Sequence, residues 1–250
     1  MRNLGAQLYT VRDKLTDYPQ ILDTLQAIRD IGYTSVQLFG APELLKPCAQ
    51  AAFDTGLAIT GVLGGMNICE NYEKELFALC ADYSIPDIGI SSSFPVCQDP
   101  DAYIQQVNAF AKKARAAGFS FSYHNHGHEF IRLPSGDTPM ERFLQGFDRE
   151  TVDFMPDTYW LHDGGCDVRH FLEQTKGRVK ILHLKDLMRT EQGHTYAEVG
   201  NGNLYFKGIL QTALACGITD FIVEQDECAA DPLDSLAVSY RNAKALLEVL

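Results

Sequence analysis

The chain has 250 residues, of which 46% are hydrophobic and 22% charged, and its formal net charge is −12. This composition suits a globular protein with a full core and excludes a disordered, collagen-like or coiled-coil chain. An acidic chain repels phosphate, so the charge argues against a nucleic-acid partner. All seven histidines lie between His124 and His194, a distribution that needs a chemical explanation.

The N-terminal segment and the cysteines suggest a compartment. The segment MRNLGAQLYTVRDKL carries early charges and no long apolar stretch, and no run of 18 apolar residues occurs in the chain. We therefore expect neither a signal peptide nor a membrane association. The seven cysteines are odd in number and form no CxxC pair, which favours free thiols and a cytoplasmic protein.

Short β-rich segments alternate with helical segments along the whole chain. In the first helix, apolar residues recur at helical spacing at Ile21, Leu25 and Ile28, and Gly32 follows the helix. The predicted elements, in chain order, are strand Leu4–Tyr9, helix Tyr18–Ile31, strand Thr34–Phe39, helix Pro42–Thr55, strand Leu57–Leu63, helix Glu70–Asp82, strand Asp87–Ile90, helix Asp99–Ala117, strand Phe119–His124, helix Thr138–Phe147, strand Val152–Pro156, helix Asp167–Thr175, strand Val179–Leu184, helix Phe206–Cys216, strand Asp220–Glu224 and helix Pro232–Leu250.

Eight strands, each followed by a helix, predict the fold class. The alternation indicates a parallel sheet, and eight units in this length match an α/β protein with a (β/α)8 TIM barrel. We expect one domain over residues 1–250. A doubly wound open sheet is the alternative, but the turn after the first strand, QLYTVRD, has no glycine, and no GxxxxGK[ST] segment occurs.

The last four predicted strands end in residues that can bind a metal ion, which are His124, Asp157, His183 and Glu224. Active sites of such barrels lie at the C-terminal ends of the strands. Polar groups at the ends of apolar strands are costly to bury unpaired, and one shared cation would satisfy all four. The mixed nitrogen and oxygen donors favour Mn²⁺, Co²⁺, Zn²⁺ or Fe²⁺ over Ca²⁺ or Mg²⁺, although Mg²⁺ stays a candidate.

Each of these residues also has a structural interpretation. A histidine at a strand end is commonly hydrogen-bonded, Asp157 could cap the following turn, and Glu224 could form an ion pair with Lys185. For each residue taken alone, the structural interpretation is preferable to a metal-binding role. Four suitable residues at four successive strand ends favour the metal site.

Several segments resemble the sugar phosphate isomerase/epimerase family, which belongs to the xylose isomerase-like TIM barrels. The segments are QLYTVRD, GYTSVQLFG, YHNHGHEF, DTYW, ILHLKD, VGNGN and IVEQD. The resemblance runs from the first strand to the last. It implies one divalent metal held by Glu, Asp, His and Glu at strands five to eight, and Asp157, His183 and Glu224 match this pattern.

Two positions depart from the family pattern. His124 stands where the family has a glutamate, and a metal-bound imidazole cannot also take a proton from the substrate. The symmetric proton transfer between two glutamates, which the family uses, is therefore in doubt here. Trp160 stands where many relatives have a substrate-facing histidine, and it could be either a sugar-stacking platform or a packing residue.

The resemblance implies a metal-dependent isomerase or epimerase that acts on a sugar or keto-sugar through an enediolate. The candidate catalytic residues are Glu224 as the base, with His126 and Lys185 as acids or oxyanion donors. The alternative is a lyase or hydratase that acts on a 3-keto sugar, a keto-glycoside or an inosose by β-elimination. Lys185 could instead only form an ion pair with Asp186 or Glu224.

The candidate substrate-binding residues are Gln7, Tyr9, Gln37, Asn125, Glu129 and Trp160. Gln7, Tyr9 and Gln37 could equally be polar filling at the barrel mouth. The loop VGNGN could close over a sugar, and no arginine cluster predicts phosphate recognition. We expect a small carbohydrate as partner, and a homodimer is possible. A DNA-repair endonuclease and a non-catalytic sugar-binding barrel are less favoured, the first because no histidine precedes His124.

Overall fold

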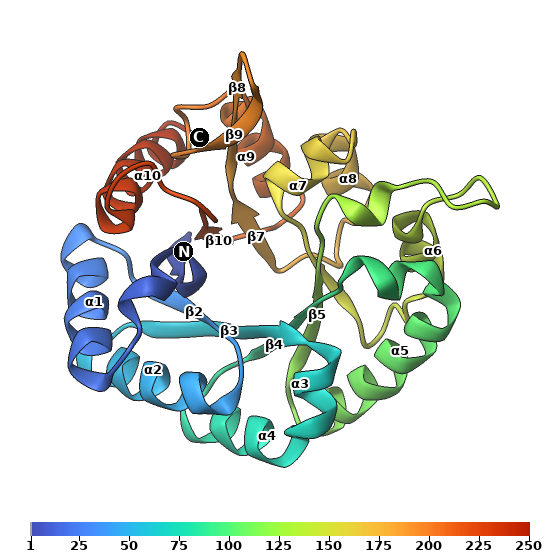
Figure 1. The fold of residues 1–250 in the computed structure, drawn as a ribbon, viewed down its shortest axis with the longest axis horizontal. Coiled ribbons are helices and arrows are strands. Elements are labelled where there is room, and N and C mark those ends of the chain that lie inside the picture. Colours follow the sequence, from blue (N-terminus) through green and yellow to red (C-terminus); the bar gives the residue numbers. More distant parts are fainter. Residues whose placement is uncertain (1) are drawn as a thin grey trace.

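Eight parallel strands form the centre of the molecule in the computed structural model, which describes residues 2–250 and, at positions 95 and 96, the backbone alone. The strand order is β6-β5-β4-β3-β2-β1-β10-β7. The two end strands, β6 and β7, are joined by the bridges Phe154–Val179 and Asp157–His183, which bring the sheet round into a barrel. Helices surround the strands on the outside (Figure 1). The predicted (β/α)8 TIM barrel is confirmed.

The strands are β1 (Asn3–Gln7), β2 (Ser35–Phe39), β3 (Ala58–Gly65), β4 (Asp87–Ser91), β5 (Ser120–His124), β6 (Asp153–Met155), β7 (Ile181–Leu184), β8 (Asp186–Thr190), β9 (Gly193–Ala197) and β10 (Asp220–Val223). The α-helices are α1 (Tyr18–Ile31), α2 (Pro42–Thr55), α3 (Met66–Asn71), α4 (Glu73–Asp82), α5 (Pro100–Ala116), α6 (Pro139–Gly146), α7 (Thr158–Asp163), α8 (Val168–Gln174), α9 (Phe206–Ala215) and α10 (Pro232–Glu248). Three 3₁₀ helices are η1 (Leu8–Lys14), η2 (Phe94–Gln98) and η3 (His128–Phe130). In these 249 described residues, no helix has both the length and the apolar composition for a membrane crossing.

Helix α1 shows how the sequence sets the outer layer. The Asp17 side chain accepts a hydrogen bond from the Gln20 N–H and so begins the helix. Ile21, Leu25 and Ile28 are buried in the main apolar cluster. Packing of such helix faces against the outside of the strands forms most of the core.

The barrel interior holds a separate, smaller apolar cluster of Met155, Ile181 and Ile222. The Gln37 side chain lies against it, with Nε2 at 3.3 Å from the Met155 sulfur. The polar residues at the barrel mouth therefore lie next to an apolar cluster inside the barrel.

Some predicted boundaries were wrong. The first strand ends at Gln7 rather than Tyr9, because the Gln7 side chain accepts a hydrogen bond from the Tyr9 N–H as the chain turns into η1. The predicted helix Glu70–Asp82 is two helices that meet at Tyr72, whose backbone has φ −125° and ψ 27°.

Helix α7, the hairpin β8–β9 and the three 3₁₀ helices were not predicted. Helix α7 follows Asp157, whose side chain accepts a hydrogen bond from the Trp160 N–H. The antiparallel hairpin β8–β9 follows Lys185 and projects from the barrel rim (Figure 1).

Asp87 lies at the start of β4, and the burial of its carboxyl group disfavours ionisation. Burial raises its pKa to about 6, and the hydrogen bond from Ser122 offsets this only in part. Because the folded-state pKa lies above the unfolded value, the stability contribution is greatest below about pH 4 and is lost as the pH rises through about 6. We expect Asp87→Asn to become more stable relative to wild type by about 2 kcal/mol between pH 4 and pH 8.

Urea unfolding at the two pH values measures this difference, with Asp23→Asn, an exposed position on α1, as the control. A difference between Asp87→Asn and wild type that does not change with pH would contradict the assignment.

Candidate active site

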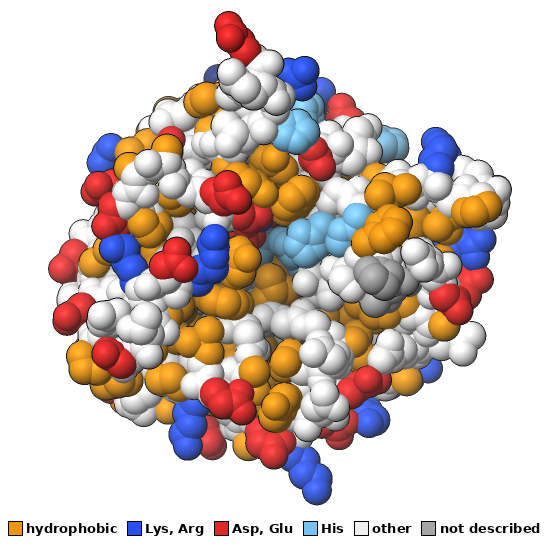
Figure 2. Space-filling model, in the orientation of Figure 1, with side chains coloured by type: hydrophobic (Ala, Val, Ile, Leu, Met, Phe, Trp, Pro, Cys, Tyr) orange, Lys and Arg blue, Asp and Glu red, His pale blue; other side chains and the backbone are white. Residues whose placement is uncertain are grey.

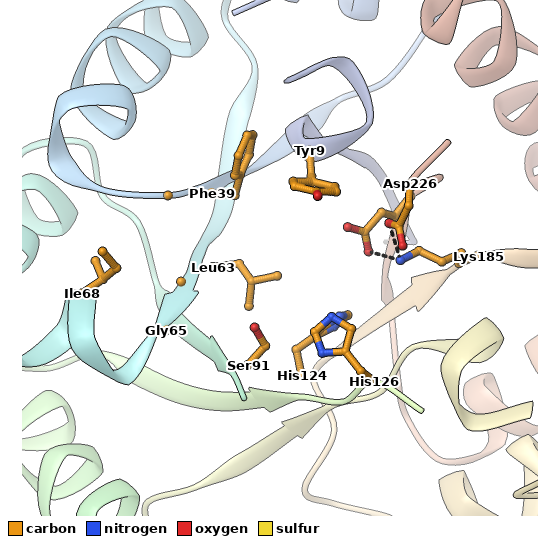
Figure 3. A pocket seen from close by; sticks show the side chains of 13 residues that line it. Tyr9, Phe39, Leu63, Gly65, Ile68, Ser91, His124, His126, Lys185 and Asp226 are labelled. Atoms are coloured by element: carbon orange, nitrogen blue, oxygen red, sulfur yellow. Dashed lines mark hydrogen bonds and ion pairs between the residues drawn. The ribbon is translucent and has the colours of Figure 1, made fainter. Parts of the chain in front are cut away.

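A cavity of about 330 Å³ opens at the C-terminal ends of the strands. Figure 2 shows this face hollowed near its centre, with histidine side chains along one edge of the hollow and apolar side chains along the other. Figure 3 shows the two walls, which consist of polar residues from the second half of the barrel and mainly apolar residues from the first half. The polar wall includes His124, His126, Lys185, Glu224 and Asp226, and the opposite wall includes Tyr9, Phe39, Leu63 and Ile68.

The four residues predicted as metal ligands lie together at this cavity. We call His124, Asp157, His183 and Glu224 the four-residue cluster. One ligand atom from each lies within 4.8 Å of the others, and all four residues are buried. His124 ends β5, His183 belongs to β7, and the two acids follow β6 and β10. The common direction of the parallel strands brings these chain-distant residues to one place.

A chain of hydrogen bonds determines the protonation of His183. The Tyr9 N–H can only donate, so the atom that accepts it, Gln7 Oε1, is the amide oxygen. Gln7 Nε2 then donates to Gln37 Oε1 at 2.6 Å. His183 Nε2 lies 2.8 Å from the same oxygen and must be the donor there.

This assignment leaves the second nitrogen of His183 facing an acid. His183 Nδ1 lies 2.8 Å from Glu224 Oε2. In the neutral imidazole both atoms present lone pairs, so a proton or a cation must lie with them. A metal ion bound by Nδ1 and the carboxylate satisfies this requirement.

Two further atoms of the four-residue cluster are buried and form no hydrogen bond, His124 Nδ1 and Asp157 Oδ2, although the Lys185 ammonium lies 3.2 Å from the latter. Burial lowers the pKa of His124 well below its usual value, and the neighbouring His183 and His126 lower it further. The imidazole is therefore neutral at pH 7, which is the form that binds metal ions. Asp157 Oδ1 caps α7, so its capping and ligand roles are compatible because they use different oxygens.

The net charge of the site favours a divalent cation. Lys185 Nζ is buried and lies 3.2 Å from Asp157 Oδ2, 3.2 Å from Glu224 Oε2 and 2.7 Å from Asp226 Oδ1. Burial raises the pKa of Asp157 to about 6, so it is ionised at pH 7. Burial favours protonation of Glu224, but the Lys185 ammonium, together with His183 when its Nδ1 carries a proton, outweighs burial and lowers the pKa of Glu224 well below its usual value. Burial also raises the pKa of Asp226, and the Lys185 ammonium opposes this shift. When Asp226 is ionised and His183 is neutral, the three carboxylates and one ammonium carry two net negative charges, which one divalent cation would neutralise.

The remaining predicted residues take different positions. His126 and Tyr9 line the cavity. Gln7 and Gln37 are wholly buried in the hydrogen-bond chain to His183. Asn125 Oδ1 accepts the Asp157 N–H at 3.1 Å, which positions that residue.

Glu129 and Trp160 are not among the residues that line the cavity. Glu129 is buried and accepts hydrogen bonds from Tyr123 and Ser92, and burial raises its pKa to about 7. Trp160 packs beside His126, with ring centroids 5.5 Å apart, and its ring lies 5.5 Å from Lys185 Nζ. This position matches the packing interpretation of Trp160.

Two acids at the site were not predicted as site residues. Asp226 pairs with Lys185, and it stands two positions after Glu224 in the VEQD segment. Asp186 organises the VGNGN loop, since its carboxylate accepts four backbone N–H groups at 2.7 to 3.2 Å, those of Leu187, Gly200, Gly202 and Leu204. A side chain at Gly202 would collide with Asp186, because an added Cβ would lie 2.4 Å from its Oδ1. The sequence signal that could have identified Asp186 is its position directly after Lys185 in the HLKD segment.

Several solved structures have the same fold as this chain. A sugar phosphate isomerase/epimerase from Parabacteroides distasonis superposes with a TM-score of 0.81 at 22% identity and covers 98% of this chain and 95% of that one. The 3-keto-D-glucoside 4-epimerase from E. coli superposes with a TM-score of 0.75 at 15% identity, and the match covers 98% of this chain and 100% of that one. A xylose isomerase-like TIM barrel protein from Mycobacterium smegmatis, in complex with magnesium, has a TM-score of 0.73 at 16% identity and covers 100% and 96%. The fold is that of the xylose isomerase-like TIM barrels.

Sequence comparison finds inosose dehydratases. The protein from Geobacillus thermodenitrificans is 24% identical over 152 residues, which are 54% of this chain and 50% of that protein. The protein from Salmonella typhimurium is 26% identical over 162 residues, which are 57% and 52%. The chain thus spans about half the length of the curated relatives it matches. No family model matches the chain.

Gln37 provides a test of the hydrogen-bond chain. Gln37→Leu leaves His183 Nε2 without its acceptor, so the imidazole no longer favours the tautomer with Nδ1 free. We expect the affinity for Mn²⁺ to fall by roughly 10- to 100-fold, the usual effect of removing such a partner. Titration calorimetry measures this affinity, and Gln26→Leu, exposed on α1, is the control. Equal affinities of Gln37→Leu and wild type would contradict the chain.

Lys185 provides a test of the charge balance. Lys185→Met removes the ammonium and leaves three neighbouring acids without it, so we expect the metal-free protein to lose about 3–5 kcal/mol of stability. A divalent cation supplies the missing charge, and saturating Mn²⁺ should therefore raise the melting temperature of this variant more than that of wild type. Thermal unfolding with and without Mn²⁺ measures both effects, with the exposed Lys207→Met as control. An equal Mn²⁺ shift in Lys185→Met and wild type would show that the two cations do not share ligands.

Proposed function

We propose that this protein is a divalent-metal-dependent enzyme that isomerises or epimerises a keto-sugar by moving a proton next to the carbonyl group. The observation that carries the proposal is the position of Glu224. It belongs to the four-residue cluster and also lines the cavity, with Lys185 Nζ at 3.2 Å from its Oε2. One carboxylate can therefore approach both a cation and a substrate carbon. The names of the structural neighbours, among them a keto-glucoside epimerase, agree with this chemistry.

His124, Asp157, His183 and Glu224 would hold the cation, which when bound supplies polarisation of a substrate carbonyl. Glu224 accepts the proton from the carbon beside that carbonyl. The C–H electron pair forms the new carbon–carbon double bond, and the carbonyl π electrons move to oxygen and give the enediolate. The Lys185 ammonium faces three carboxylates and contributes its charge near this oxyanion. Return of the proton to the other face of the same carbon gives the epimer. Its delivery to the former carbonyl carbon, with transfer of the hydroxyl proton between the two oxygens, gives the isomer.

The cavity walls support an uncharged sugar as substrate. Among the described residues that line the cavity, Lys185 is the one Lys or Arg, and three carboxylates already surround it. The phosphate of a sugar phosphate would have no cationic partner there. The Tyr9 and Phe39 rings, in edge contact with centroids 5.2 Å apart, form an apolar surface suited to the C–H face of a sugar ring.

A lyase is the second candidate, and His124 favours it. With an imidazole in place of a glutamate, Glu224 has no equivalent carboxylate on the opposite strand, and the acid and base are chemically different. Such a pair suits loss of a β-substituent, in which the enediolate electrons expel the leaving group and a nearby donor protonates it. The matched inosose dehydratases carry a name that fits this branch.

Deuterium incorporation separates these possibilities. The Mn²⁺-loaded protein is incubated in D₂O with ketoses, inososes and 3-keto glycosides, and mass spectrometry and NMR follow the label and the product. We expect deuterium at a carbon next to the carbonyl, because Glu224 exchanges the abstracted proton with solvent. Glu224→Gln should reduce the exchange rate by about 10²- to 10⁴-fold.

Glu227→Gln, an exposed acid three residues away, is the matched control and should keep the wild-type rate. The carbon skeleton of the product distinguishes isomerase, epimerase and lyase. Full exchange by Glu224→Gln, or no exchange with any compound, would contradict the proposal.

A further inference from the structure

A second group of imidazole and carboxylate side chains adjoins the four-residue cluster. His126, His128 and Glu129, which we call the second cluster, each offer one ligand atom within 4.8 Å of the others. The three residues lie within positions 126–129, His126 in the loop after β5 and the other two in η3. The ring centroids of His126 and His124 are 5.2 Å apart, so the two clusters lie side by side.

Hydrogen bonds fix the Glu129 carboxylate in the way that surrounding donors fix carboxylates that bind metal ions. Its Oε1 accepts hydrogen bonds from the Tyr123 hydroxyl at 2.6 Å and from Ser92 Oγ at 3.1 Å. Its Oε2 accepts the His126 N–H at 2.9 Å. A carboxylate has about four acceptor positions, so one position on Oε2 remains free. Such fixing by surrounding donors is typical of ligating carboxylates.

The two histidines complete the donor set. His126 Nδ1 is buried and has no hydrogen-bond partner, which is costly unless another group satisfies it. His128 Nε2 lies 3.5 Å from Glu129 Oε1 and 3.2 Å from Ser92 Oγ. The two imidazole rings are nearly parallel, at 18°, with centroids 5.4 Å apart.

Glu129 also lacks a permanent counter-ion. Among the ion pairs formed by the described residues, its partner is His128, which is charged only when protonated. A wholly buried carboxylate without a fixed positive charge is strongly disfavoured, so burial favours its protonated form. A cation bound by the carboxylate would displace that proton and supply the neutralising charge.

We propose that His126, His128 and Glu129 form a second divalent-cation site for a borderline metal such as Zn²⁺ or Co²⁺. Two imidazoles and one carboxylate are a donor set that zinc takes when one coordination position stays open. His126 lines the cavity, so an ion held here would face the substrate space and would bind a sugar hydroxyl or carbonyl oxygen. The inference concerns cation binding alone and does not depend on the proposed reaction.

The test is a count of bound Co²⁺ per chain. The full-length protein is dialysed against CoCl₂, the metal is measured by mass spectrometry, and the visible spectrum records its coordination. We expect two equivalents for wild type, one for His128→Ala and one for Asp157→Asn. Glu129→Gln, which keeps the shape of the side chain, should also bind one, and His170→Ala, at an exposed histidine on α8, should bind two.

The outcomes separate the two sites. One equivalent in wild type that His128→Ala and Glu129→Gln retain would overturn the second site and leave the four-residue cluster intact. One equivalent that Asp157→Asn retains and His128→Ala loses would support the second site and contradict the metal centre of the proposed function. Circular dichroism of each variant confirms that loss of metal does not reflect loss of folding.

Discussion

Buried charge at the mouth of the barrel is the constraint on which the rest of the site depends. Asp157, Glu224 and Asp226 surround one ammonium, that of Lys185. Acids in such a place are stable only when cations and hydrogen bonds compensate them. The neutral imidazoles of His124 and His126 add donors but no charge, since burial lowers the pKa of both, that of His126 to about 4. The net negative charge of the site would be balanced by a bound cation, and the residue types present would suit a transition metal.

The two halves of the barrel contribute differently to this arrangement. The second half supplies the acids, Lys185 and the histidines of the site, His124, His126 and His183. The first half supplies the apolar wall and the hydrogen-bond chain from the Tyr9 N–H through Gln7 and Gln37. This chain makes His183 Nε2 the donor to Gln37 and turns Nδ1 toward Glu224, so both halves define the candidate metal site.

The strands and the four-residue cluster could be predicted because both follow from short-range pattern and topology. Alternating segments predict parallel strands, and parallel strands bring their C-terminal ends to one rim, so His124 and Glu224 meet although 100 positions separate them. The roles of Gln7 and Gln37 could not be predicted, since they depend on register. These residues face each other as paired positions of β1 and β2, and their bond to His183 crosses the barrel.

Trp160 shows a second limit of sequence-based prediction. Its side chain is placed by α7, a six-residue helix that begins at the Asp157 cap and has too few positions to show a periodic pattern. Asp226 and Asp186 were missed because an acid near a strand end has many uses, and only the fold shows that one holds Lys185 and the other the VGNGN loop. The candidate ligand residues were visible in the sequence, whereas the residues that position them were not.

The central claim is that His124, Asp157, His183 and Glu224 hold one divalent cation at the barrel mouth. The most direct measurement is the anomalous scattering of a crystal of the Mn²⁺-loaded protein, recorded at the manganese absorption edge. The account predicts a peak bonded to His183 Nδ1 and to oxygens of Asp157 and Glu224, with His124 as the fourth ligand. A crystal without a peak among these residues, at a Mn²⁺ concentration that saturates binding in solution, would contradict it.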